Sequence, residues 1–207
     1  MNKQAMKNLV FQVLEEGISD PEFRPRKSED AFVRKIVGGK QMLGVPLWDH
    51  SPRFDISLNI CIRLDAAEQI YHRFSGSPPK YQSMSTTTIT RLEYFTGGPR
   101  RYSLVTADDV TSVGREICKV VRDKVIPFLD RHKDAKSLDE AVNCTQPGLD
   151  ITQDPAGSME AVILAHLAGN PDFDAVVTKL RQRMELSPEA DHAFNRLAAY
   201  LKEEKGS

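Results

Sequence analysis

The chain has 207 residues, of which 40% are hydrophobic and 28% are charged. A chain of this length can bury roughly 70% of its unfolded surface, and the composition excludes collagen-like, low-complexity and wholly disordered proteins. The 28 basic and 29 acidic side chains give a net charge of −1, so no overall field draws the chain onto nucleic acid or an anionic membrane. Any charged partner must therefore be recognised by a local patch.

The cysteines and the N-terminus indicate the compartment. Cys61, Cys118 and Cys144 are odd in number and form no CxxC pair, which argues against a disulfide framework. The N-terminal apolar run is cut by Gln12 and then by Glu15, unlike a signal peptide. No stretch approaches the roughly 18 apolar residues that a membrane span requires. We therefore expect a cytoplasmic protein.

The first predicted elements are a helix and a hairpin. Apolar residues at three- and four-residue spacing predict a helix over residues 3–16. Two strand-like segments, 32–37 and 41–45, flank the pair Gly38–Gly39. A glycine pair adopts the positive φ that a tight hairpin turn demands, so we expect these segments to pair.

A strict alternation of apolar and polar residues predicts one long strand over residues 53–64. The apolar face consists of Phe54, Ile56, Leu58, Ile60, Ile62 and Leu64. The polar face consists of Arg53, Asp55, Ser57, Asn59, Cys61 and Arg63. Such a pattern is typical of an antiparallel sheet with one packed face and one face that is partly wet.

A short helix and a second hairpin follow in the pattern. Residues 65–74 read as a helix that ends before the Ser/Gly/Pro-rich segment 75–79. The β-branched and aromatic stretch 86–95 and the stretch 101–105 flank Gly97–Gly98. They are therefore expected to pair as a second hairpin.

The second half of the chain is predicted to be helical. Thr106, followed by Asp109 in the first turn, caps a long helix that Pro127 should kink or shorten near its end. A capping box over residues 137–140 opens another short helix. Residues 143–154 resemble a linker.

Three capping residues that precede prolines then mark three helix starts. The predicted helices cover residues 155–168, 171–185 and 188–204. The fold class is thus α+β, an antiparallel sheet of about five strands with helices packed on one face, plus a C-terminal helical segment. We predict an α+β domain over residues 1–145 and a helical extension over residues 146–207.

The sequence lacks the common motifs of nucleotide, acyl-transfer and metal chemistry. The sequence contains no GxGxxG, P-loop, GxSxG, HExxH or calcium-loop pattern. Its five histidines are scattered, and no two of them stand four residues apart on a helix. We predict neither a cofactor nor a metal ion.

Two neighbouring clusters carry the candidate binding residues. Trp48, Asp49 and His50 precede the long strand and combine an aromatic ring with acid and base side chains, and the polar strand face continues the surface. The predicted contact residues are Trp48, Asp49, His50, Arg53, Asp55, Asn59 and Arg63. The plainer interpretation is a turn in which the tryptophan plugs the core edge, next to an ordinary solvated sheet face.

Three chemical alternatives stay open from the sequence. A metal-dependent hydrolase or nuclease would use Asp49, His50 and Asp55, and would need them to converge in one pocket. Cys61 lies near Arg63, where a thiolate could be favoured. Residues 1–103 carry 15 basic and 11 acidic side chains. This excess of four charges is too modest to favour nucleic-acid binding.

The order of elements resembles a bacterial family, domain of unknown function 4304, over about residues 1–145. The resemblance rests on the N-terminal helix and on the segments 32–37, 54–60 and 125–129 with Ser137-Leu138 after them. It implies an α+β fold with helices on an antiparallel sheet and transfers no catalytic residues.

The leading hypothesis is a non-catalytic binding or regulatory module, comparable by analogy with immunity proteins, whose partner is another protein. The C-terminal helices either close a small core locally or dock in trans to make a homodimer.

Overall fold

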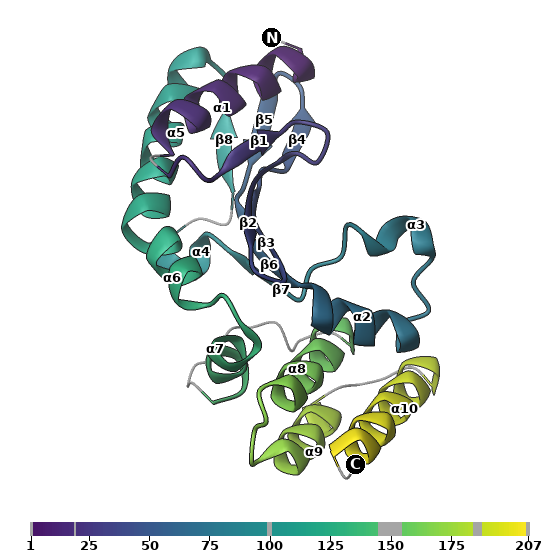
Figure 1. The fold of residues 1–207 in the computed structure, drawn as a ribbon. Coiled ribbons are helices and arrows are strands. Elements are labelled where there is room, and N and C mark those ends of the chain that lie inside the picture. The colour runs from purple at the N-terminus through teal and green to yellow at the C-terminus, as the bar shows by residue number, and fades with distance from the viewer. Residues whose placement is uncertain (1, 19, 99–100, 145–154, 184–187, 206–207) are drawn as a thin grey trace. The chain divides into compact units, whose positions relative to one another are not determined.

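A computed structural model describes residues 2–18, 20–98, 101–144, 155–183 and 188–205 (Figure 1). The contacts divide the chain into two compact units. The first comprises residues 1–36, 40–61 and 90–131, and the second comprises residues 37–39, 62–89 and 132–207. The division into an α+β domain over residues 1–145 and a helical extension over residues 146–207 stays a prediction.

The strands form two sheets, which confirms the α+β class. They are β1 (Arg24–Arg26), β2 (Ala31–Ile36), β3 (Gly39–Gly44), β4 (Leu47–His50), β5 (Arg53–Ile56), β6 (Asn59–Leu64), β7 (Thr88–Arg91) and β8 (Tyr102–Leu104). An antiparallel five-stranded sheet has the order β1-β2-β3-β6-β7, and a three-stranded sheet has the order β4-β5-β8. The hairpin at Gly38 is confirmed, and its φ of +70° is the left-handed conformation that glycine favours.

Two strand predictions are wrong. The single strand over residues 53–64 is two strands in different sheets, since β5 pairs with β4 and β8 whereas β6 belongs to the five-stranded sheet. At the break, Ser57 N still donates to Pro46 O, the next position in the β4–β5 register, and Pro46 has no N–H group to return the bond. The second hairpin does not form, because β7 and β8 also lie in different sheets, with a helical turn, α4 (Glu93–Thr96), after β7.

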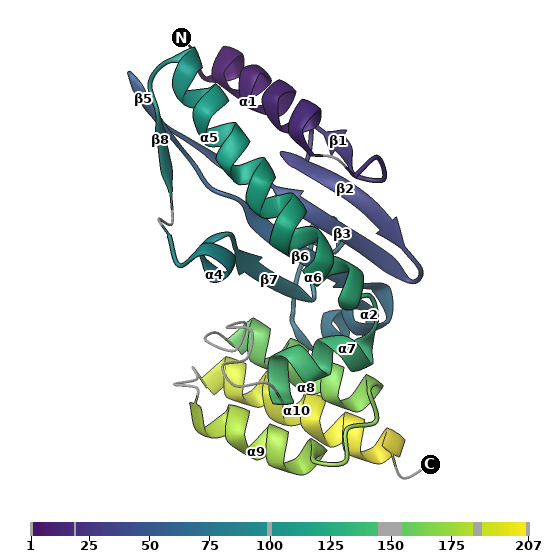
Figure 2. The same ribbon diagram turned by 90° about the vertical axis from the view of Figure 1, so that its left-hand side faces the viewer.

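Two helices cover the first unit. Figure 2 shows α1 (Lys3–Gly17) beside α5 (Ala107–Val120), both on one side of the strands. The Phe11 and Phe32 rings stack at 5.2 Å and tie α1 to β2. At Gly114 a Cβ would lie 2.4 Å from Val13 Cγ1, so the glycine lets the two helices approach closely.

The helix after β8 follows its caps and its proline. Thr106 caps its start, as the sequence predicts, and Asp109 completes a capping box with it. Near its end, five residues form a π-helical turn, η1 (Val121–Val125), before α6 (Ile126–Arg131). Pro127 lacks the N–H group of a regular helix, and such a wider turn avoids a clash with the preceding turn.

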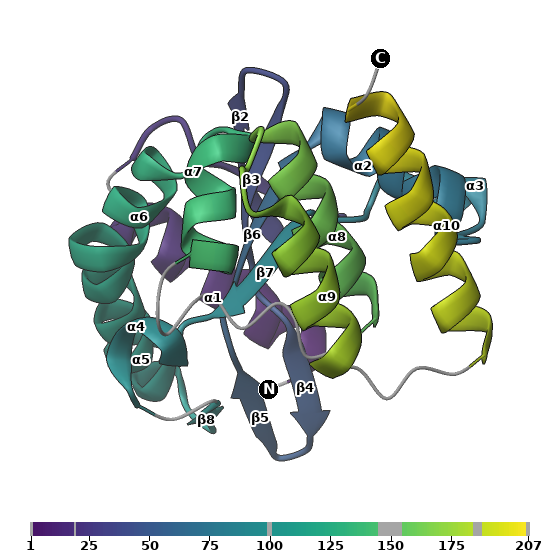
Figure 3. The same cartoon turned by 90° about the horizontal axis from the view of Figure 1, so that it is seen from below.

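The second unit is mainly helical (Figure 3). Its helices are α2 (Asp65–Phe74), α3 (Pro79–Gln82), α7 (Ala135–Asp139), η2 (Glu140–Cys144), α8 (Pro155–Leu167), α9 (Phe173–Arg183) and α10 (Pro188–Lys205). The helices predicted at 65–74, 155–168 and 188–204 are confirmed. The remaining proline-marked helix, α9, starts two residues after Pro171, at Phe173. α7 starts earlier than predicted because Asp134 is its cap. The predicted linker lies mostly outside the described residues.

The apolar faces of α8, α9 and α10 are buried within this one chain. Val162, Leu180, Leu197 and Leu201 are each at most 2% exposed. These side chains are thus buried within the chain, and the homodimer stays a prediction.

Candidate functional site

The three-stranded sheet collects most of the predicted binding residues on one face. In the antiparallel pairing of β4 with β5, Trp48 lies opposite Asp55 and His50 lies opposite Arg53. Asp55 also lies opposite Ser103 of β8. Side chains directly opposite each other point to the same side of a sheet, and so do residues two apart on a strand. These five residues therefore share a face, which we call the Trp48 face.

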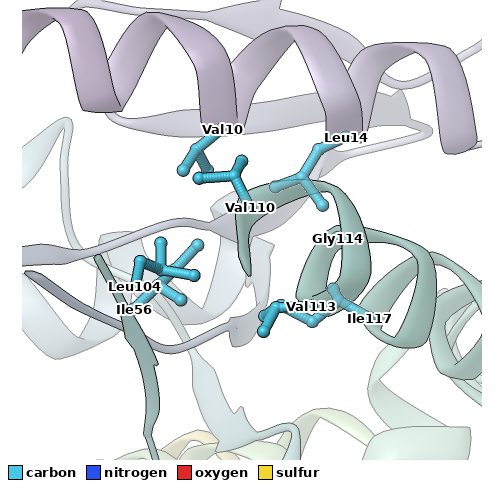
Figure 4. Close-up of a pocket in the computed structure, with 8 residues that line it drawn as sticks. All are labelled: Val10, Leu14, Ile56, Leu104, Val110, Val113, Gly114 and Ile117. Carbon is cyan, nitrogen blue, oxygen red and sulfur yellow. The ribbon is translucent and has the colours of Figure 1, made fainter. Parts of the chain in front are cut away.

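The other face of this sheet packs into the core. Ile56 and Leu104 line a small apolar cavity with α1 and α5 (Figure 4). Water centres could occupy only about 10 Å³ of this cavity. That is near the minimum for one water molecule, which would also need polar partners, so the cavity is a packing gap. The Trp48 face points away from the core that α1 and α5 cover.

Asp55 is the polar centre of the Trp48 face. It is 8% exposed, and its Oδ1 accepts a hydrogen bond of 2.9 Å from Ser103 Oγ. Arg53 Nε lies 3.3 Å from the same oxygen, and His50 Nε2 lies 3.7 Å from Oδ2. The carboxylate thus orients Arg53 and lies close to His50, two more exposed side chains of its own sheet.

Trp48 contacts an arginine from a distant part of the sequence. The Arg101 guanidinium carbon lies 4.2 Å from the centre of the indole ring, within the range of a cation–π interaction. Arg101 makes no hydrogen bond or ion pair with any residue that the structure describes. Its N–H donors are therefore available to a ligand.

Asp49 does not join this cluster. It lies opposite Phe54, and so on the other face of the sheet, and its Oδ1 accepts a hydrogen bond from Ser51 N in the turn between β4 and β5. The convergence of Asp49, His50 and Asp55 that a hydrolase would need is therefore not present. Within the described ranges, no group of three or more histidine, cysteine, aspartate or glutamate side chains could hold a metal ion.

Asn59 and Arg63 are also separate from the Trp48 face. Both belong to β6 of the five-stranded sheet, and both are half-buried. Arg63 lies in the second unit, where its Nε pairs with Asp65 Oδ1 at 2.9 Å. The continuous row of polar residues expected from Arg53 to Arg63 is thus divided between two sheets.

Cys61 does not have the properties of a reactive thiolate. It is 7% exposed, and burial raises its pKa to about 12 even though the charge of Lys40 lowers it. The thiol therefore stays protonated near neutral pH and serves as a packing group.

A second polar cluster, which the sequence analysis missed, lies inside the second unit. Glu68 of α2 is 0% exposed, and its Oε1 accepts a hydrogen bond of 2.8 Å from Thr87 Oγ1. Its Oε2 accepts a hydrogen bond from Ser85 Oγ. The same oxygen lies 3.4 Å from His72 Nε2 and 3.7 Å from Arg63 Nη1. We call these five residues the Glu68 cluster.

The Glu68 cluster holds the segment after α2 in place. Arg63 Nη1 donates to the backbone oxygens of Gln82 and Ser85, at 2.8 and 3.0 Å. Leu64 N donates to Thr87 Oγ1 at 3.0 Å. The polar groups are thus used mainly for internal pairing. In a catalytic triad an acid accepts a hydrogen bond from Nδ1 of the histidine, but Nδ1 of His72 has no partner in the described part of the chain.

A further carboxyl group is buried on α8, which packs against α2. Glu160 is 3% exposed, and its Oε2 has no hydrogen-bond partner among the described residues. Burial raises the pKa of Glu160 well above its usual value of 4.5, the charge of Glu68 raises it further, and Arg63 lowers it. The surroundings of Glu160 therefore favour its neutral form.

One sequence signal could have revealed the Glu68 cluster. Glu68 and His72 stand four residues apart in a segment correctly predicted as a helix, so they share one side of it. The sequence has no two histidines at this spacing on a helix, but it has this acid–histidine pair. The contacts with Ser85 and Glu160 come from distant segments, and no local pattern encodes them.

The comparisons with known proteins add no relative. No family model, curated protein or solved structure matches this chain. The resemblance to domain of unknown function 4304 therefore stays a prediction. No helix in the described residues combines the length and apolar character that crossing a membrane requires.

Proposed function

We propose that this chain is a non-catalytic binding module that contacts another protein through the Trp48 face. The observation that carries the proposal is the meeting of Trp48 with Arg101 on an exposed sheet face, beside Arg53 and His50. Tryptophan and arginine contribute binding energy at protein interfaces more often than other residues do.

The arrangement of acidic and basic groups supports binding over catalysis. The single carboxylate on the Trp48 face, Asp55, is paired with Ser103 and Arg53 and is not positioned as a general base beside a second acid. Asp49, the other acid that a hydrolase would use, lies on the opposite face. The odd number of cysteines supports a cytoplasmic location for such a module.

Affinity capture with a matched pair of variants tests the proposal. Trp48→Ala removes the half-buried indole ring of the face, and Tyr94→Ala removes an exposed aromatic ring of the same unit. We expect the wild-type chain and Tyr94→Ala to retain a partner protein that Trp48→Ala loses. The same set of captured proteins from all three chains, or none from any, would contradict the proposal.

A further inference from the structure

The charges on the Trp48 face identify the chemistry of its partner. We propose that the partner presents a carboxylate-rich peptide segment, which Arg101 and Arg53 bind while Trp48 packs against its apolar parts. This inference rests on the proposed function and makes it more specific. It names the groups that the partner must carry.

Arg101 is the main recognition group. Its side chain is oriented by the indole ring 4.2 Å away, so little side-chain entropy remains to be lost when it binds. No carboxylate within the described ranges neutralises it. A planar guanidinium offers two parallel N–H donors, a geometry that fits a carboxylate.

Arg53 is a second, partly engaged cation. It uses Nε toward Asp55, its side chain is 53% exposed, and no other contact of its guanidinium is present in the described chain. His50 is its cross-strand neighbour and is 46% exposed. Trp48, Asp55 and Ser103 form a row across the three strands. By register, Arg53 lies on one side of this row, and Arg101, which directly precedes β8, lies on the other side. A bound segment can therefore engage both ends of the face.

The balance of charge and apolar surface favours an acidic protein over nucleic acid. The two arginines exceed the one aspartate by a single charge, whereas nucleic-acid binding depends on several phosphate contacts. Trp48 and Val105, which is 52% exposed directly after β8, add apolar surface that protein side chains can cover. A short acidic segment with apolar residues between its carboxylates matches these groups.

The single tryptophan of the chain makes a direct test feasible. Its fluorescence is recorded while a capped octaglutamate peptide is added, with octalysine as the charge-reversed probe. We expect a saturable change with octaglutamate only, and a weaker affinity as salt is raised. Arg53→Gln/Arg101→Gln should weaken the affinity at least tenfold, whereas Arg24→Gln/Arg26→Gln, the same charge change on exposed β1, should not.

Several outcomes would overturn the inference. They are no saturable change with octaglutamate, an equal affinity for octalysine, an equal affinity of both double variants, or tighter binding of an oligothymidine of equal charge. A captured protein that Trp48→Ala loses, together with any of these results, would leave the proposed function standing and remove only the acidic partner. Matching unfolding transitions of the variants would show that a lost signal is not a lost fold.

Discussion

The Trp48 face and the Glu68 cluster use the same residue types in opposite settings. Both contain arginine, histidine, serine and one carboxylate. On the Trp48 face the cations are exposed, and Arg101 has no ionic partner in the described chain. In the Glu68 cluster the central carboxylate is 0% exposed, and four side chains surround it.

This difference shows how burial decides what a polar group does. A buried charge loses its hydration, so it must be paired within the fold, and removing its partner is costly. An exposed charge retains water, contributes little to stability, and stays available to another molecule. We therefore expect changes in the Glu68 cluster to affect folding and changes on the Trp48 face to affect binding.

The largest expected effect is the loss of the buried carboxylate. Glu68→Ala should destabilise the chain by about 3–5 kcal/mol, because it leaves Arg63 and the hydroxyls of Ser85 and Thr87 without their acceptor. Asp65→Ala is the matched control, since it removes an acid 54% exposed from the same arginine and should cost less than about 1 kcal/mol. Chemical denaturation measures both, and equal losses would contradict the account.

The next effect is a pH dependence from Glu160. Its raised pKa means that the folded state retains a proton that the unfolded state releases above pH 4.5. Stability should therefore be complete below pH 4.5 and decrease as the pH rises through the pKa of the folded state. Glu160→Gln, which stays neutral, should remove this decrease, and urea unfolding measured over pH 4.5–8 tests it.

Other shifted carboxyl groups act outside this pH range. Backbone hydrogen bonds lower the pKa of Asp109 and Asp134 below 3.8, so their contribution to stability is lost only as the pH falls further. A pH slope that is the same in wild type and Glu160→Gln would therefore show that Glu160 is ionised in the folded chain.

A smaller effect is expected from the one acid of the Trp48 face. Asp55→Ala removes the acceptor of Ser103 and the partner of Arg53, both of which can turn to water. We expect a loss of about 1 kcal/mol in unfolding free energy. A loss as large as that of Glu68→Ala would show that this face is structural.

The smallest effect on stability should come from the exposed arginines. Arg53→Gln/Arg101→Gln should change the unfolding free energy by at most about 1 kcal/mol, since the pair contributes one partly exposed ion pair and one cation–π contact. Thermal unfolding monitored by circular dichroism measures this change. A larger loss would mean that the two side chains hold the sheet together.

Local patterns predicted several of the elements but not how the strands assemble. The glycine hairpin, the Thr106 cap and the proline-marked helices follow from residues close in sequence. The break between β5 and β6 does not, because Ile56, Leu58 and Ile60 remain buried on both sides of it and keep the alternation intact. The choice of partner strand depends on distant segments.

The candidate site shows the same limit. The alternation correctly placed Arg53 and Asp55 on one face, because they lie two residues apart. Trp48 and His50 were grouped with them only as neighbours in sequence. The alternation could not predict that Asp55 is buried or that Arg101 lies over the Trp48 ring. The contacts of Asp55 with Ser103 and of Trp48 with Arg101 join segments about 50 residues apart. Asp49 was included because it is adjacent in sequence, and adjacent strand residues point to opposite faces.

The most direct test of the Trp48 face is an NMR titration of the isotope-labelled chain with the octaglutamate peptide. The account predicts that the largest changes in amide chemical shift fall in residues 47–56 and 101–105. The amides of residues 63–87, the segment that contains the Glu68 cluster, should not shift. Shifts centred on residues 63–87 or on the C-terminal helices would contradict it, and so would an unchanged spectrum.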